Sequence, residues 1–198
     1  MSLTGVTRIK IMVLAFGLWA PSAVMAENTP YDNSIDKHQA QFEKVALDLW
    51  GFAELGYQET QSSTLLQAEL KKEGFKVTSG IADIPTAFKA EYGTDGPVIG
   101  ILGEFDALPG IAQSASPFKE VIDNATGAGQ ACGHHLFGAG SAWAAVAIKE
   151  WLEDTKTPGR VVFYGTPAEE GGSGKVYIAR SGAFENVDIM LHWHPGSS

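Results

Sequence analysis

The residues best suited to chemistry in this chain lie in three short stretches. Residues 129–138 set the thiol of Cys132 and the imidazole of His134 two positions apart, just before an expected helix. Residues 167–172 carry two adjacent glutamates in a glycine-rich turn after an apolar run, and residues 187–194 end with two histidines. The chain has one cysteine, and four of its five histidines fall in two tight groups. Ligands for borderline metal ions are therefore concentrated in these stretches.

The combination of thiolate, imidazole and carboxylate suits Zn²⁺ or a related divalent ion. Cys132 and His134, separated by one residue on a loop, can both turn toward one ion. Of the adjacent Glu169 and Glu170, one can bind the metal while its neighbour acts as a general base toward water. A metal lowers the pKa of bound water to roughly 7. The pattern predicts metal-assisted hydrolysis of an amide.

The residues alone leave several alternatives open. Side chains two positions apart on a strand share a face, so either His192 or His194 could complete the site. Cys132 could instead be a nucleophile with a neighbouring histidine as its base, because the start of a helix can depress a thiol pKa. That alternative leaves the two glutamates without a role. A lone cysteine is also often a small core residue, and a Glu-Glu pair is usually a solvated turn.

The elements expected to position these residues alternate between helices and strands. Helices are expected at residues 34–51, 60–73, 136–151 and 174–184. Strands are expected at residues 75–78, 87–92, 98–102, 160–165 and 187–193. The last two strands are apolar runs of the kind that is buried on both faces. Residues 111–131 are expected to form a long loop. The order predicts an α/β fold with its ligand site beyond the carboxyl ends of the strands.

The N-terminus predicts an export signal. Arg8 and Lys10 precede an apolar run at residues 11–20, and small or apolar residues follow at 24–26. Ten apolar residues are well short of the roughly 20 that span a bilayer. We therefore expect residues 1–26 to be a cleaved signal peptide, residues 27–198 to form the mature domain, and the protein to be periplasmic with no membrane anchor.

The composition fits an acidic globular domain. The 198 residues are 44% hydrophobic and 19% charged, with 14 Lys and Arg against 23 Asp and Glu. Removing the expected signal leaves 12 − 23, a net charge of −11. Such a surface repels phosphate backbones, so no nucleic-acid partner is expected. Residues 172–175 resemble part of a phosphate-binding loop, but Ala168 and Val176 stand at positions that this motif requires to be Gly and Ser or Thr.

Four motifs together resemble the M20 metallopeptidase family, in its amidohydrolase branch. They are GEFDALP at 103–109, ACGH at 131–134, PAEEGG at 167–172, and the stretch from Val187-Asp188 to His194-Pro195. The likeness covers most of residues 36–196. It implies a three-layer zinc-exopeptidase-like α/β sheet flanked by helices. It also implies hydrolysis of N-acyl amino acids, aminobenzoyl-glutamate or dipeptide-like substrates, with one or two Mn²⁺ or Zn²⁺ ions.

The resemblance also implies roles for individual residues. Cys132, His134 and Glu170 match metal ligands, and Glu169 matches the general base. Asp106 matches an aspartate that orients a metal-binding histidine.

The remaining ligand of the family lies six residues after the aspartate of its Val-Asp pair. Counted from Asp188, that position is His194, which we prefer to His192. His135 stands where relatives carry Asp or Asn.

The second half of the family pattern has no match in this sequence. Members continue through a lid or dimerisation domain and then finish the catalytic sheet, which supplies a late histidine ligand. We therefore expect residues 27–198 to be the N-terminal part of the catalytic domain, with weak or no turnover alone and a homodimer possible only in a full-length form. A non-catalytic module that binds a metal or a small molecule is the alternative.

Overall fold

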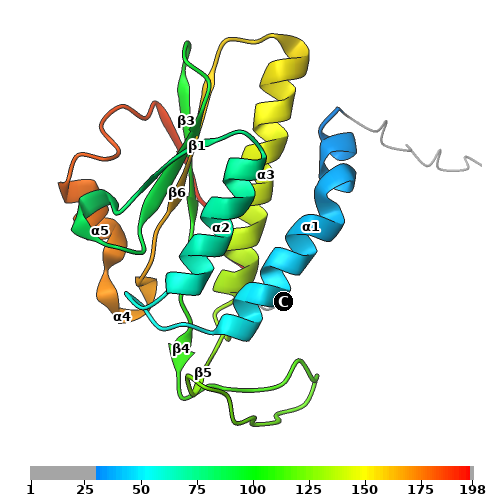
Figure 1. Cartoon of the computed structure of the whole chain (residues 1–198), viewed down its shortest axis with the longest axis vertical. Helices are drawn as coiled ribbons and strands as arrows, with labels where there is room; N and C mark the ends of the chain where they lie inside the picture. The colour runs from blue at the N-terminus through cyan, green and yellow to red at the C-terminus, as the bar shows by residue number, and fades with distance from the viewer. Residues whose placement is uncertain (1–29, 197–198) are drawn as a thin grey trace, which may run out of the picture.

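A five-stranded mixed sheet forms the middle of the computed structural model, which describes residues 30–196 (Figure 1). The strand order is β1-β2-β6-β3-β7, and the strands are β1 (Lys76–Ser79), β2 (Phe88–Tyr92), β3 (Val98–Gly103), β6 (Arg160–Gly165) and β7 (Ile189–Leu191). β3 runs parallel to β6 and β7, whereas β2 pairs antiparallel with β1 and β6. The register sets Gly103 opposite Gly165, so β3 and β6 end at the same level.

Three long helices cover one face of the sheet. They are α1 (Pro30–Phe52), α2 (Thr60–Lys72) and α3 (His134–Thr155), and Figure 1 shows them side by side. Phe42, Val45 and Leu49 recur at helical spacing on α1 and are buried. They pack in one hydrophobic core with Ile101 of β3 and Phe163 of β6.

The other face of the sheet is covered by shorter elements. These are the 3-10 turn η1 (Ile81–Asp83), α4 (Glu169–Gly172) and α5 (Gly174–Arg180). Val98 and Leu102 share a face of β3 and pack on this side with Val162 and Tyr164 of β6. The sheet therefore lies between two helical layers, and the predicted three-layer α/β class is confirmed.

The prediction of a buried strand over residues 187–193 is wrong. β7 contains only three residues, and the side chains of Ile189 and Leu191 are 52% and 46% exposed. β7 is an edge strand that pairs with β3 alone, and no further strand among residues 30–196 lies beyond it. An apolar run does not reveal whether a strand is central or at an edge. His192 and His194 consequently follow the strand in irregular chain.

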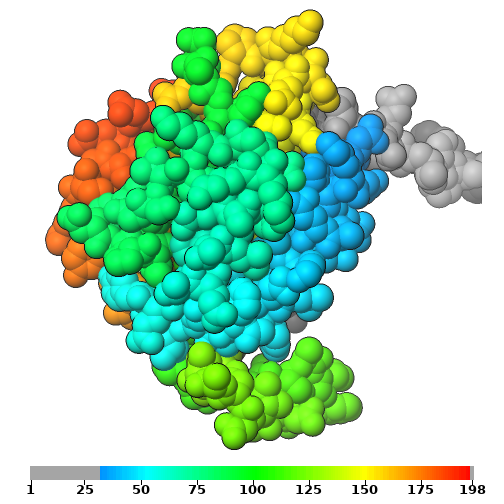
Figure 2. All heavy atoms as spheres, in the orientation of Figure 1, coloured from blue at the N-terminus to red at the C-terminus, as the bar shows by residue number. Residues whose placement is uncertain are grey.

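The expected loop at residues 111–131 is confirmed. Two-residue strands, β4 (Leu108–Pro109) and β5 (Ala128–Gly129), pair at its base. Figure 2 shows the loop, in green, projecting from the body of the molecule. It returns the chain from the end of β3 to the start of α3, which begins two residues before the expected helix.

The expected signal peptide lies outside the described residues, so export to the periplasm stays a prediction. Within residues 30–196, no helix has both the length and the apolar content that crossing a bilayer demands.

A half-buried ion-pair cluster joins α3 to α1. Glu150 Oε1 lies 2.5 Å from Lys37 Nζ and 2.9 Å from His38 Nε2, and the Glu150 side chain is 17% exposed. Burial raises the pKa of Glu150, but hydrogen bonds from His38 and Lys37 outweigh it and lower the pKa to about 2, from 4.5. The folded pKa is below the unfolded value, so this stabilisation is present above pH 4.5 and is lost as the pH falls toward 2.

We predict that Glu150→Gln lowers the free energy of unfolding at pH 7 by about 1–3 kcal/mol, because the variant loses charge-assisted hydrogen bonds. Urea unfolding at pH 7 and at pH 3 measures the effect, and the difference from the wild type should shrink at the lower pH. Glu43→Gln on the exposed face of α1 is the matched control, expected to stay within about 0.5 kcal/mol. An equal difference at both pH values would contradict the prediction.

Candidate metal centre

His134 lies at the centre of the candidate site. It occupies the first turn of α3 and is fully buried. Gly133 precedes it with φ 84°, a left-handed conformation that glycine adopts easily and that turns the chain into the helix. His134 Nδ1 lies 3.0 Å from Asp106 Oδ1 and 3.1 Å from the Asp106 carbonyl oxygen. With Nδ1 donating to Asp106, Nε2 is the atom left to face the site.

Asp106 positions a second element as well. Its Oδ2 accepts a hydrogen bond from the backbone N–H of Glu170 at 2.9 Å. One buried carboxylate therefore fixes both the ring of His134 and the turn that carries the glutamates. Asp106 is the residue to which the family resemblance gave an orienting role, which stays a prediction.

The turn after β6 presents the two glutamates. Ala168, which precedes them, is buried in a left-handed conformation with φ 57°. Its N–H donates to Glu59 Oε1 at 2.8 Å, and Glu59 Oε2 accepts a hydrogen bond from Thr86 Oγ1 at 2.9 Å. Burial raises the pKa of Glu59 to about 6. No local pattern marks Glu59 as a supporting residue, because its partners lie far away along the chain.

The structure brings the predicted site residues together. Glu169 Oε2 and Glu170 Oε1 each lie 3.9 Å from His134 Nε2. Cys132 Sγ lies 3.4 Å from His194 Nε2, and the ligand atoms of Cys132, His134 and His194 are all within 4.8 Å of one another.

His192 takes a different position from His194. Its Nε2 lies 3.5 Å from Glu104 Oε1, whereas His194 is the histidine beside Cys132. His135, the departure from the family pattern, turns away from the site and packs edge-on against Trp50 at a ring-centroid distance of 5.0 Å.

Three buried atoms of the site favour a cation. Apart from their ionic contacts with one another, His134 Nε2, Glu104 Oε2 and Glu170 Oε1 have no hydrogen-bond partner within residues 30–196. Burying a polar atom without a partner is costly, and a divalent ion can satisfy several such lone pairs at once. The donor set of sulfur, nitrogen and carboxylate oxygen is one that such ions accept. The residues therefore fit a metal.

The charges around the thiol argue against the cysteine-nucleophile alternative. Burial, and then the nearby carboxylates led by Glu170, raise the pKa of Cys132 to about 12. An activated nucleophilic cysteine needs a lowered pKa. The carboxylates also act on His134: burial lowers its pKa, but Asp106 and Glu104 outweigh that and raise it to about 10.

Glu104 is a site residue that the sequence reasoning missed. It lies directly after β3 and is 2% exposed, with its carboxylate between Lys175 and His134. Burial raises the pKa of Glu104, but the adjacent His134 and Lys175 outweigh it and lower the pKa to about 2. Glu104 lies two residues before Asp106 at the end of a strand, and residues two apart in extended chain point to the same side. This spacing is the sequence signal that could have identified Glu104.

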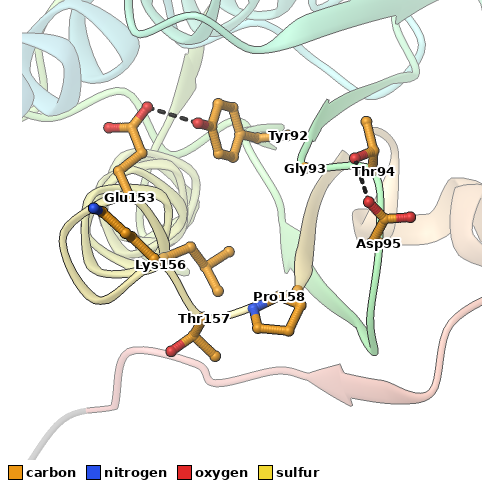
Figure 3. Close-up of a pocket in the computed structure, with 10 residues that line it drawn as sticks. Tyr92, Gly93, Thr94, Asp95, Glu153, Lys156, Thr157 and Pro158 are labelled. Atoms are coloured by element: carbon orange, nitrogen blue, oxygen red, sulfur yellow. Dashed lines mark hydrogen bonds between the residues drawn. The ribbon is translucent and has the colours of Figure 1, made fainter.

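Two cavities differ in their relation to this centre. One of about 360 Å³ adjoins Glu170 and is lined by residues that include Leu55, Tyr57 and Pro109. The other, of about 440 Å³, lies at the opposite end of the sheet, between the β2–β3 turn and the end of α3 (Figure 3). It contains none of the predicted site residues, whereas the cavity beside Glu170 adjoins one of them.

The fold and the site define an α/β protein of the metallopeptidase class. The family model for peptidase family M20/M25/M40 matches residues 100–198. The chain belongs to this family. The predicted family is thereby confirmed.

Individual relatives agree with this assignment. The chain is 40% identical over 164 residues to a subunit of the p-aminobenzoyl-glutamate hydrolase of Escherichia coli, covering 83% of this chain and 34% of the relative. It is 32% identical over 177 residues to human Xaa-Arg dipeptidase, covering 81% of this chain and 37% of that protein. The chain thus spans about a third of the length of these curated relatives.

A solved structure shows the same fold. It is a Bacillus subtilis protein described as a dinuclear metal-binding peptidase from the M20 family. The TM-score is 0.69 at 27% identity, and the match covers 81% of this chain and 44% of that chain.

We predict that Asp106→Asn weakens Zn²⁺ binding about 10- to 100-fold. The amide of asparagine has only one oxygen that can accept hydrogen bonds, so the variant loses its contact either with His134 or with the N–H of Glu170. Isothermal titration calorimetry measures the affinity. Asp95→Asn makes the same chemical change at the opposite end of the sheet and should leave affinity unchanged. Equal affinities for the wild type and Asp106→Asn would refute the orienting role.

Proposed function

We propose that this chain forms the metal-binding part of an amidohydrolase that cleaves a small amide substrate with metal-activated water. The observation that carries the proposal is the convergence of Cys132, His134, Glu170 and His194 on one partly buried, acidic centre. Mn²⁺ and Zn²⁺ are the ions proposed. Substrates of the kind named for the relatives, p-aminobenzoyl-glutamate, dipeptides and hippurate, support an N-acyl amino acid or dipeptide-like amide.

The four ligands have different chemical contributions. The thiolate of Cys132 and the imidazoles of His134 and His194 favour Zn²⁺, whereas the carboxylate of Glu170 also suits Mn²⁺. Asp106 holds the His134 ring in the orientation that turns Nε2 toward the ion. When bound, the ion supplies Lewis acidity and lowers the pKa of water.

Glu169 is the residue proposed to move the proton. Its carboxylate is 42% exposed and lies 3.9 Å from His134 Nε2, so it borders the centre while remaining open to water. From this place Oε2 can take a proton from the attacking water and later give it to the leaving amine. Glu170 is 17% exposed, and its Oε1 has no hydrogen-bond partner within the described residues, so it is the better placed of the two to hold the ion.

The cavity of about 360 Å³ beside Glu170 supports a small substrate. Leu55, Tyr57 and Pro109 give it apolar surface, and the Tyr57 hydroxyl donates to the Gly172 carbonyl oxygen at 2.5 Å, which fixes the ring. An aromatic or aliphatic acyl group suits such a lining, with the amide toward the glutamates.

Substitution of the adjacent glutamates tests the proposal. We predict that Glu169→Gln lowers the rate of hydrolysis about 10²- to 10⁴-fold while metal affinity stays within a few-fold of the wild type. Glu170→Gln is the paired variant, and it should weaken metal binding itself. Calorimetry with Mn²⁺ and Zn²⁺ gives the affinities. Hydrolysis of p-aminobenzoyl-glutamate and N-benzoylglycine is followed with the chain in excess over substrate, because slow turnover is expected.

The outcomes separate the alternatives. Metal binding without hydrolysis in the wild type supports the non-catalytic binding module. Hydrolysis that survives a chelator would refute the metal mechanism and favour the thiol. Loss of metal from Glu169→Gln would show that the roles of the two glutamates are reversed.

A further inference from the structure

Glu104 is a buried carboxylate that the proposed mechanism does not use. Its side chain is 2% exposed and follows the last residue of β3. One oxygen, Oε1, contacts Lys175 Nζ of α5 and lies 3.5 Å from His192 Nε2. The other oxygen, Oε2, forms an ion pair with His134 Nε2 at 2.9 Å, and neither Oε2 nor Nε2 has a further hydrogen-bond partner in the described part of the chain.

The two oxygens of Glu104 therefore have different surroundings. The ammonium group of Lys175 satisfies Oε1 and fixes the orientation of the carboxylate. Oε2 faces Nε2 of a histidine whose Nδ1 already donates to Asp106. When the ring is protonated these two atoms form a buried ion pair at 2.9 Å, and when the ring is neutral the lone pair of Nε2 faces Oε2 with no proton between them. A divalent cation can take the place of that proton and bind both atoms as ligands.

The separation suits neighbouring ligands of one ion. Ligand atoms bound at about 2.1 Å and at right angles lie about 3 Å from each other. Glu169 contributes to the same group, because the ligand atoms of Glu104, His134 and Glu169 all lie within 4.8 Å of one another. This group is separate from the one formed by Cys132, His134 and His194, and only His134 belongs to both.

We propose that Glu104 is a further metal ligand of this centre, binding through Oε2, and that Lys175 is the residue that positions it. The inference rests on the proposed function, since it assigns a ligand to the same metal. It adds a carboxylate oxygen to a site otherwise rich in sulfur and nitrogen. Carboxylate oxygen favours Mn²⁺ more than thiolate does, so Glu104 matters most for binding Mn²⁺.

Mn²⁺ alone, titrated calorimetrically into the whole chain, tests this ligand. Glu104→Gln and Glu104→Asp should each weaken Mn²⁺ binding at least about 10-fold. The first removes the charge, and the second withdraws the oxygen by one methylene. Glu153→Gln on the outer surface of α3 is the matched control and should bind Mn²⁺ as the wild type does. X-ray absorption at the manganese edge should show one oxygen neighbour fewer in Glu104→Asp.

The aspartate variant separates direct binding from a charge effect. If Glu104→Asp keeps both wild-type affinity and the full set of neighbours, Glu104 is not a ligand and the inference is overturned. Thermal unfolding monitors the fold, and if Glu104→Gln does not fold, the aspartate variant, which keeps a charge facing Lys175, decides alone. A wild-type chain that binds neither Mn²⁺ nor Zn²⁺ would overturn the proposed function itself, whereas normal binding by both variants would overturn only the role of Glu104.

Discussion

The carboxylate of Asp106 is the contact on which the candidate centre depends. Its two oxygens accept hydrogen bonds from His134, 28 residues away, and from the N–H of Glu170, 64 residues away. Three segments that are separate in sequence meet at this one group: the chain after β3, the first turn of α3 and the turn of α4. A buried carboxylate is stable only when its oxygens are satisfied, so the same hydrogen bonds that assemble the site also hold Asp106 in the interior.

The sheet makes this meeting possible. β3 and β6 are parallel and end in register, so the residues that follow them leave the sheet at the same edge. Both strands end in glycine. A Cβ on Gly103 would lie 2.6 Å from the Phe163 ring, and one on Gly165 would lie 2.2 Å from the Phe88 ring. The missing side chains let aromatic rings fill the core directly beneath the site, which gives the polar residues above them a rigid support.

Local patterns in the sequence predicted the layers and most of the site. Helical periodicity and short apolar runs indicated the helices and strands, and four spaced motifs indicated the residues that the structure gathers. Contacts between distant segments leave no such pattern: Glu59 supports the glutamate turn only through Ala168, and Glu104 meets Lys175 across 71 residues. The choice between His192 and His194 has the same physical limit. The sequence argument assumed that both histidines lie on a strand and share a face, but β7 ends at Leu191, before either of them. Only the fold shows that His194 is the one beside Cys132.

Burial and the charge distribution together perturb the titrating groups of the centre. Burial, and then the nearby carboxylates, raise the pKa of the Cys132 thiol. Burial lowers the pKa of His134 and raises that of Glu104, but Asp106 and Glu104 outweigh it at His134, and His134 and Lys175 outweigh it at Glu104. The first two shifts reflect an excess of negative charge in a partly buried site, whereas the third reflects the positive charge of His134 and Lys175 beside Glu104. The imidazolium ion of His134 offsets part of the negative charge, and the thiol adds none while it stays protonated. A divalent cation balances this negative charge with more positive charge at one point, and its ligands bind in their deprotonated forms, so metal uptake by this centre is coupled to proton release.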